Sequence, residues 1–327
     1  MSSASIAWPE ALAGTPAVAV IEQAITRQRL SHSLLITGDE IETLESVAHA
    51  IADRLLNPPD SPNPFPLAQH PDLVSLRAKG KMRIIPIGKA GAPEPGTMRD
   101  FMPKLYVSPA ISRHKVGIVY EAETMRHESA NAFLKTLEEP PPHTTLLLLT
   151  TRPYALLPTI RSRCLTFRFP ALDQAYTPDG WMPWLDDYGA WIRRLTEGVS
   201  DRAAASDAIF AGYGLVARFS TILDFATTEA WKIQKQNLPD DLGDDEKVAI
   251  ETGIANGLRL RLLAGIERTT RDAALPRILD GDTTASHALG EAVAALEHAV
   301  RLLRLNLKVD AALETFMLTS LRLWAKR

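Results

Sequence analysis

The segment Thr159–Cys164, TIRSRC, gathers residues that can do chemistry. Arg161 and Arg163 flank Ser162, and Cys164 is the single cysteine among 327 residues. A guanidinium stays charged at any working pH and binds phosphate oxygens through two hydrogen bonds. The arginine pair therefore fits a solvated loop, a salt-bridge network or a positive charge directed at phosphate. The apolar LTF after Cys164 favours packing over a nucleophilic thiol, because a buried thiol behaves as a small hydrophobe.

A second candidate lies where an apolar strand ends in glycine and a helix begins, LLITGDEIETLESVAHAIA (34–52). This is where a phosphate-binding loop, G-x-x-x-x-G-K-[ST], would lie. Counted from Gly38, the second glycine position holds Thr43, the lysine position Leu44 and the hydroxyl position Glu45. The stretch also carries acidic residues, and a like-charge contact with phosphate at ~4 Å costs about 4 kcal/mol at an effective dielectric of ~20. We expect this degenerate loop to bind no nucleotide.

Two other strand ends carry polar residues at positions that matter in nucleotide hydrolases. In VGIVYEAE (116–123), Tyr120 and Glu121 stand where such an enzyme uses Asp-Glu to hold Mg²⁺ and polarise water. Without a first acidic residue the metal has no evident ligand there, and we interpret Glu121 as a remnant. Thr150 and Thr151 end the next apolar run, and we expect them to cap the turn before Pro153.

The elements that must position these residues alternate along the first half of the chain. Apolar runs predict strands at 33–37, 72–76, 115–120 and 144–151, and helical spacing predicts helices at 16–30, 41–56 and 127–139. Pro140–Pro142 end the last of these helices. Strands alternating with helices predict an α/β doubly wound parallel sheet that closes near Phe169.

After Pro170 the patterns become helical, with long helices expected at 285–305 and 309–324. Segments 57–71, 88–97 and 238–247 are rich in proline, glycine or acidic residues and are expected as loops. The turn-rich segment 171–184 is the expected boundary between the two halves.

Composition limits the class of protein. Net charge is −3, hydrophobic content 46% and charged content 23%, typical of a soluble globular protein. A single cysteine excludes an internal disulfide and a cysteine-rich zinc site, and is typical of a reducing compartment. The first residues lack the pattern of a signal peptide, and no run of ~18 uninterrupted apolar residues occurs. We expect a cytoplasmic protein that does not span a membrane.

The segment NAFLKTLEEPPPHTTLLLLTTRPYALLPTIRSRCLTFRF (131–169) closely resembles the clamp-loader AAA+ subunits of bacterial DNA polymerase III, of the gamma/tau and delta prime type. RLSHSLLITG (29–38) resembles the entry strand of that family, and 306–324 resembles its last collar helix. The resemblance covers about 15–170 and the C-terminal helix. It implies an AAA+ α/β domain over 1–170, a small helical lid over 171–225 and an all-helical collar over 226–327.

Within that family the degenerate loop with a retained Ser162-Arg163-Cys164 resembles delta prime, the member that does not hydrolyse ATP. The resemblance implies that Arg163 is an arginine finger for the ATP of a neighbouring subunit, supported by Arg161. It gives Thr150 and Thr151 a sensor-like position, and implies no ATP, Mg²⁺ or zinc bound by this chain. The implied partners are gamma/tau-type ATPase subunits and the delta subunit in a ring, primed DNA through its backbone and, indirectly, the sliding clamp.

Several alternatives remain open on the sequence. Arg163 could pair with a carboxylate of its own domain, and the chain could be an ATP-driven motor with an atypical loop or an inactive adaptor of another machine. Two basic clusters are candidates for DNA phosphates, although solvated surface is the commoner outcome. They are Lys79, Lys81 and Arg83, and Arg301, Arg304 and Lys308.

Overall fold

The computed structural model describes residues 6–59, 61, 65–91, 94–170, 177–199, 201–236, 238, 242–304 and 307–325. Contacts divide the chain into two compact units. The first, here called the sheet unit, comprises Met1–Ala175 and Gln236–Gly253. The second, the helical unit, comprises Tyr176–Lys235 and Ile254–Arg327. Each unit has a hydrophobic core of its own and is described by itself.

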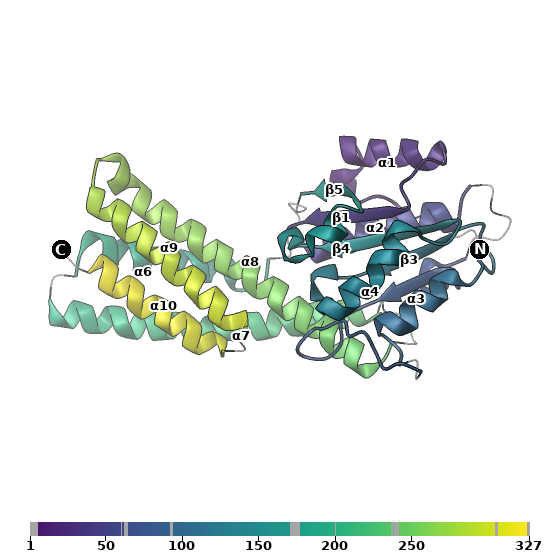
Figure 1. Cartoon of the computed structure of the whole chain (residues 1–327). Coiled ribbons are helices and arrows are strands. Elements are labelled where there is room, and N and C mark those ends of the chain that lie inside the picture. The colour runs from purple at the N-terminus through teal and green to yellow at the C-terminus, as the bar shows by residue number, and fades with distance from the viewer. Residues whose placement is uncertain are drawn as a thin grey trace. The chain divides into compact units, whose positions relative to one another are not determined.

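The sheet unit is built on five parallel strands in the order β2-β3-β4-β1-β5 (Figure 1). The strands are β1 (Ser33–Gly38), β2 (Leu73–Leu76), β3 (Lys115–Val119), β4 (Thr144–Thr150) and β5 (Leu165–Phe169). Because β1 lies between β4 and β5, the chain leaves it toward one side of the sheet and later returns to its other side. The carboxyl ends of adjacent parallel strands at such a switch point are where α/β proteins place their ligands.

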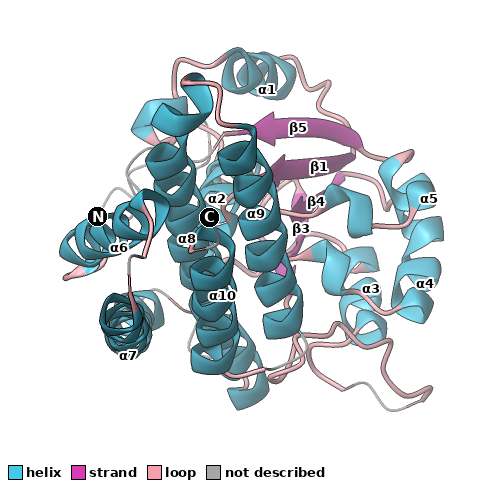
Figure 2. Cartoon of the chain, turned by 90° about the vertical axis from the view of Figure 1, so that its left-hand side faces the viewer, coloured by secondary structure: helices cyan, strands magenta, loops and turns pink. Residues whose placement is uncertain are grey.

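Helices cover both faces of this sheet (Figure 2). The helices α1 (Pro16–Thr26) and α2 (Ile41–Leu56) share one core with Leu34 and Ile36, whereas the intervening Leu35 belongs to the opposite core. That opposite core contains α3 (Met98–Tyr106), α4 (His127–Glu138) and the short α5 (Pro158–Arg161). The alternation follows the two-residue period of a strand and explains why β1 and β4 are buried on both faces.

Four short 3₁₀ helices complete the connections of this unit: Glu10–Leu12, Leu67–Gln69, Ala122–Thr124 and Pro153–Ala155. The beginning of α8 also belongs to the sheet unit. The Gly80 backbone N–H donates to the Asp245 carbonyl at 2.9 Å, and Ala249 is buried in the core under α3 and α4. The turn at 79–84 is thereby fixed against the start of α8.

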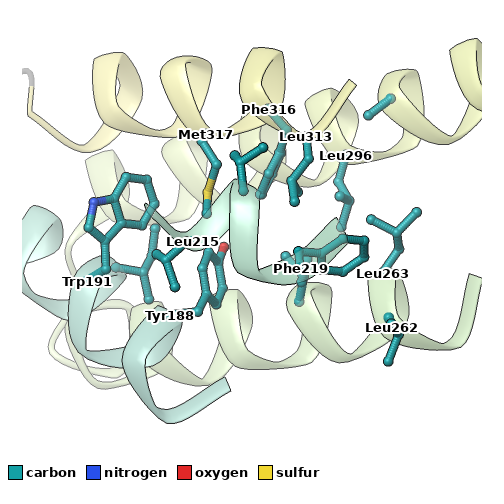
Figure 3. Close-up of a cluster of buried hydrophobic side chains, with 14 of the residues drawn as sticks. Tyr188, Trp191, Leu215, Phe219, Leu262, Leu263, Leu296, Leu313, Phe316 and Met317 are labelled. Carbon is teal, nitrogen blue, oxygen red and sulfur yellow. The ribbon is translucent and has the colours of Figure 1, made fainter. Parts of the chain in front are cut away.

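The helical unit contains α6 (Trp181–Glu197), α7 (Arg202–Gln236), most of α8 (Asp244–Leu279), α9 (Thr283–Arg304) and α10 (Val309–Trp324). Aromatic side chains of α6 stack along its core: the rings of Trp184 and Tyr188 lie 5.4 Å apart and nearly parallel. Phe219 of α7 and Phe316 of α10 are fully buried beside aliphatic residues of α8 and α9 (Figure 3). Burial of one face of each helix stabilises this unit.

The structure confirms the expected α/β sheet followed by helices and corrects several details. The helix predicted over 16–30 ends at Thr26, and the structure adds β5 and α3 to the expected elements. The expected loop 238–247 is shortened because α8 begins at Asp244, and residues 239–241 lie outside the described residues. Residues 171–176 of the expected boundary segment also lie outside them, and the segment's last residues already form the first turn of α6.

The helix α7 bears on two of the expectations. It runs unbroken through residue 225, where the resemblance placed the end of a lid-like domain, and the division into lid and collar stays a prediction. By length and composition α7 is also apolar enough to cross a membrane. One of its faces, from Ala208 through Phe219 to Ala226, is buried in the helical core. Within the apolar window itself, 33% of the residues are buried.

Candidate functional site

The phosphate-loop position lies at the carboxyl edge of the sheet, where β1 ends and α2 begins. Gly38 is needed there for packing: a Cβ on it would lie 2.5 Å from the Phe169 carbonyl oxygen and 2.8 Å from Leu44 Cδ2. Leu44, in the lysine position, is fully buried, and Thr43 is 3% exposed. The residues that would have to reach phosphate are therefore part of the hydrophobic core.

Glu45, in the hydroxyl position, is bound to a neighbouring strand end. The Arg77 guanidinium donates to both of its oxygens, at 2.9 and 3.4 Å, and lies 3.3 Å from the centre of the Tyr120 ring. The Tyr120 hydroxyl is 2.8 Å from His49 Nε2. Glu45, Arg77, Tyr120 and His49 are called the edge network below. It joins α2 to the ends of β2 and β3.

The edge network carries no net charge. The charges of Glu45 and Arg77 are opposite, and the rings of Tyr120 and His49 are uncharged. Burial raises the pKa of Tyr120 to about 12, and burial lowers the pKa of His49, so that both rings are uncharged at neutral pH. Burial alone disfavours the charged Arg77 guanidinium, but Glu45 and Tyr120 outweigh it and raise the pKa of Arg77. Sequence reasoning missed Arg77. Its signal was an arginine directly after the strand predicted at 72–76.

Glu121 follows β3 in a left-handed backbone conformation, with φ at 48°. Its carboxylate is bound to the Arg83 guanidinium, and both side chains are largely buried. Burial raises the pKa of Glu121, and the opposing effect of Arg83 offsets this only in part. The ion pair with Arg83 occupies this carboxylate, whereas a raised pKa by itself moves a glutamate toward the range of a general base.

Thr150 is fully buried at the end of β4, and its hydroxyl accepts a hydrogen bond from the Arg152 backbone N–H at 3.0 Å. This is the turn contact that the sequence predicts. Thr151 is half-buried in the same turn. Arg152 in turn donates from Nε to Glu123 at 3.3 Å, which keeps the turn before Pro153 close to the end of β3.

The segment Ser162-Arg163-Cys164 follows α5. Arg163 donates from Nε to Glu138 of α4 at 2.6 Å and from Nη1 to the Thr159 carbonyl at 2.8 Å. The side chains of Arg163 and Glu138 are 31% and 48% exposed. This is the intradomain carboxylate that the sequence left open. An ion pair this exposed contributes ~0–1 kcal/mol, so a stronger anion can replace it.

The neighbours of Arg163 have local roles in this structure. The Arg161 guanidinium lies 5.0 Å from the centre of the exposed Tyr154 ring, and the Ser162 hydroxyl donates to the Thr159 carbonyl at 3.1 Å. Both contacts tie the loop to itself. Cys164 packs against the core beneath α4, and burial raises its pKa to about 12, which removes the reactivity of the thiol at neutral pH.

The first basic cluster is mostly engaged within the sheet unit. Arg83 is bound to Glu121, and Lys79 donates to the Pro95 carbonyl and lies 3.8 Å from Glu94, whereas Lys81 is exposed.

In the second basic cluster, Arg301 and Lys308 are exposed, and the side chain of Arg304 lies outside what the structure describes. Among the described residues, no group of three or more His, Cys, Asp or Glu side chains is arranged to hold a metal ion. The absence of a metal or nucleotide remains a prediction.

Residues 14–173 match the family model described as DNA polymerase III, delta subunit. The chain is similar to the tau/gamma subunit of DNA polymerase III from Haemophilus influenzae, 30% identical over 157 residues, which is 48% of this chain and 23% of the relative. It is also similar to the tau subunit from Salmonella typhimurium, 34% identical over 145 residues, 44% of this chain and 22% of the relative. The gamma/tau subunit of Mycobacterium bovis is 32% identical over 156 residues, covering 47% and 27% of the two chains.

Two solved structures are similar at lower identity. A DNA polymerase III gamma subunit-related protein of Thermotoga maritima is 22% identical, with a TM-score of 0.42 and coverage of 93% of this chain and 99% of its own. The Bacillus subtilis DNA clamp loader delta protein is 10% identical, with a TM-score of 0.33 and the same coverage.

The chain spans less than a quarter of the length of the Haemophilus and Salmonella relatives. The match to the family model is confined to residues 14–173, just under half of the chain. The relatives carry the names gamma and tau, and assignment to one class of subunit is a separate question.

Proposed function

We propose that this chain is a non-hydrolysing, delta prime-like subunit of a bacterial DNA polymerase III clamp loader that supplies Arg163 to the nucleotide of a neighbouring ATPase subunit. In this role it completes a ring with gamma/tau-type subunits and a delta subunit in the cytoplasm. The ring loads a sliding clamp onto primed DNA, which it contacts through the DNA backbone.

The observation that carries the proposal is the edge network. In the place of a phosphate cradle, Leu44 is buried and Glu45 is held by Arg77 against Tyr120. Binding ATP there would require a phosphate to displace core packing and approach a carboxylate, both unfavourable. The residues present therefore do not fit a nucleotide, and an ATP-driven motor is the disfavoured alternative.

Arg163 fits a role in trans because its guanidinium is accessible and weakly held. In the isolated chain Glu138 occupies one edge of the guanidinium. A γ-phosphate presented by a neighbour carries more negative charge and accepts two parallel hydrogen bonds, so it can outcompete the carboxylate. The guanidinium then stabilises the charge that spreads over the transferred phosphoryl oxygens.

Reconstitution with gamma/tau-type and delta subunits tests the role of Arg163. The Arg163→Ala variant is expected to co-elute with the complex while lowering its DNA-stimulated ATP hydrolysis, because a missing finger costs ~10³-fold or more at the site it completes. Arg168→Ala is the matched control, since Arg168 is an exposed arginine of β5 whose only carboxylate contact in the described chain is a 3.6 Å pair with Asp39. Unchanged hydrolysis with Arg163→Ala would show that the arginine is structural.

Equilibrium binding of a fluorescent ATP analogue to the isolated chain tests the other half of the proposal. No saturable binding and no turnover are expected. Saturable turnover by the chain alone would favour the motor, and failure to co-purify with clamp-loader subunits would favour an adaptor of another machine.

A further inference from the structure

A groove with a volume of about 520 Å³ lies between α3 and α4 on the sheet unit. These helices pack through Phe101 and Phe133, whose rings meet edge to face with centres 6.0 Å apart. The adjoining residues Met102 and Ala132 line the groove, together with Tyr106, which is 57% exposed. The exposed Tyr106 ring and the side chains of Met102 and Ala132 give the groove an apolar wall.

Positive charge surrounds this groove. Lys89, Arg99 and Lys135 belong to its lining, and none of the described lining residues is acidic. Arg99 is oriented by a hydrogen bond from Nη1 to the Gly88 carbonyl at 2.9 Å. The nearby carboxylate of Asp100 is engaged elsewhere, because it accepts from the Lys104 ammonium at 2.8 Å. The groove therefore combines an apolar wall with three cationic side chains, and no acidic side chain belongs to its described lining.

We propose that the groove between α3 and α4 binds an acidic peptide segment that carries a large apolar side chain. The apolar side chain lies against Met102 and Tyr106, and flanking carboxylates pair with Lys89, Arg99 and Lys135. The volume lies within the ~300–1,000 Å³ of sites that enclose a small ligand or an anchor residue. Clusters of basic residues beside an apolar pocket are a recurring mode of acidic-motif recognition.

The apolar wall decides between a peptide and a nucleic-acid backbone. Phosphates gain affinity from cations through counterion release and gain nothing from Met102, Ala132 and Pro103. A peptide uses both features of the groove. The groove contains neither Arg163 nor any residue of the edge network among its lining residues.

Fluorescence anisotropy with the full chain tests the groove. The probes are a labelled peptide with a central Phe-Leu pair flanked by aspartates, the same peptide with lysines in place of the aspartates, and a labelled DNA duplex. The acidic peptide is expected to bind with an affinity that falls as salt rises, and the lysine peptide is not.

Two variants locate the binding. Lys89→Glu/Lys135→Glu is expected to weaken binding of the acidic peptide about tenfold or more, because two attractive contacts become repulsive. Tyr106→Ala is expected to weaken it through the lost apolar contact. Lys81→Glu is the control for the single variant Lys135→Glu: Lys81 is exposed, does not line the groove, and undergoes the same change of charge as Lys135 in that variant.

Three outcomes would overturn the proposal. They are absence of acidic-peptide binding to the wild-type chain, equal loss of affinity with Lys81→Glu, and binding of the duplex that the groove variants abolish while the peptide is unaffected. Circular dichroism of each variant establishes that these surface substitutions leave the fold intact.

Discussion

Removing one partner of the Glu45–Arg77 pair should destabilise the sheet unit strongly. The side chains of Arg77 and Glu45 are only 11% and 15% exposed. Breaking a buried pair by truncating one partner costs ~3–5 kcal/mol, because a desolvated charge is left without compensation. Some solvent reaches both groups, so for Glu45→Ala we expect the lower end, about 3 kcal/mol. With a urea slope of ~2 kcal/mol per molar, the midpoint of unfolding falls by about 1.5 M.

The single cysteine provides an assay that reports on the sheet unit alone. Cys164 lies in that unit, packs against its core and has a pKa raised to about 12, so the native thiol reacts slowly. Brief thiol labelling across a urea series therefore measures the opening of this unit without a signal from the helical one. Glu94→Ala is the matched control, since its pair with Lys79 spans 3.8 Å and Glu94 is 56% exposed. It should cost less than about 1 kcal/mol.

The double variant Glu45→Leu/Arg77→Leu checks the cause. Replacing a buried ion pair by apolar residues of similar size is often neutral, so the double variant should be more stable than Glu45→Ala. A loss below about 1 kcal/mol for Glu45→Ala, or a double variant as unstable as the single one, would refute the account of a desolvated pair.

Three further outcomes follow from single contacts. Gly38→Ala should cost about 1–3 kcal/mol in the same labelling assay, because the new methyl group would overlap the Phe169 carbonyl oxygen. His114 is half-buried, and desolvation lowers its pKa to about 4. In the unfolded chain the imidazole binds a proton near its ordinary pKa of about 6.5. The contribution of the neutral His114 to the free energy of unfolding is therefore complete above pH 6.5 and declines as pH falls toward 4. The shift is discounted because His114 is partly exposed. Over that pH range the free energy of unfolding of the wild type should fall by about 2 kcal/mol more than that of His114→Gln, as measured by urea titrations at each pH. Glu138→Gln should change stability by less than about 1 kcal/mol and leave hydrolysis by the reconstituted complex at or above wild type. A fall as large as that of Arg163→Ala would mean that Glu138 itself positions the arginine.

The sheet could be predicted from sequence because its signals are local. The apolar runs of β1 and β4 are buried on both faces, and Pro140–Pro142 end α4 as predicted. The strand β5, LTFRF, was not predicted, because only Phe169 in it is buried and its alternation is weak. The helix α3 follows a proline-rich loop and contains Pro103, both of which weaken a helical pattern.

The residue types of the candidate site could be predicted from the sequence, but the ion pairs that its side chains form could not. The missing lysine at Leu44 was evident from sequence, whereas Arg77 is 32 positions from Glu45, and only the fold brings the two together. The Arg163–Glu138 pair has the same origin, with a separation of 25 positions. The start of α8 likewise packs on the sheet unit because of a tertiary contact at Gly80, which no periodicity encodes.

The edge network has an evolutionary consequence. A lysine at Leu44 would bury an ammonium group in the core, a serine at Glu45 would strand the Arg77 guanidinium, and an aspartate at Tyr120 would open a cavity beside His49. Each step alone costs a sizeable share of the ~5–15 kcal/mol by which a protein is typically stable. A phosphate loop can therefore arise from this arrangement only through several coordinated substitutions, because each single step destabilises the fold.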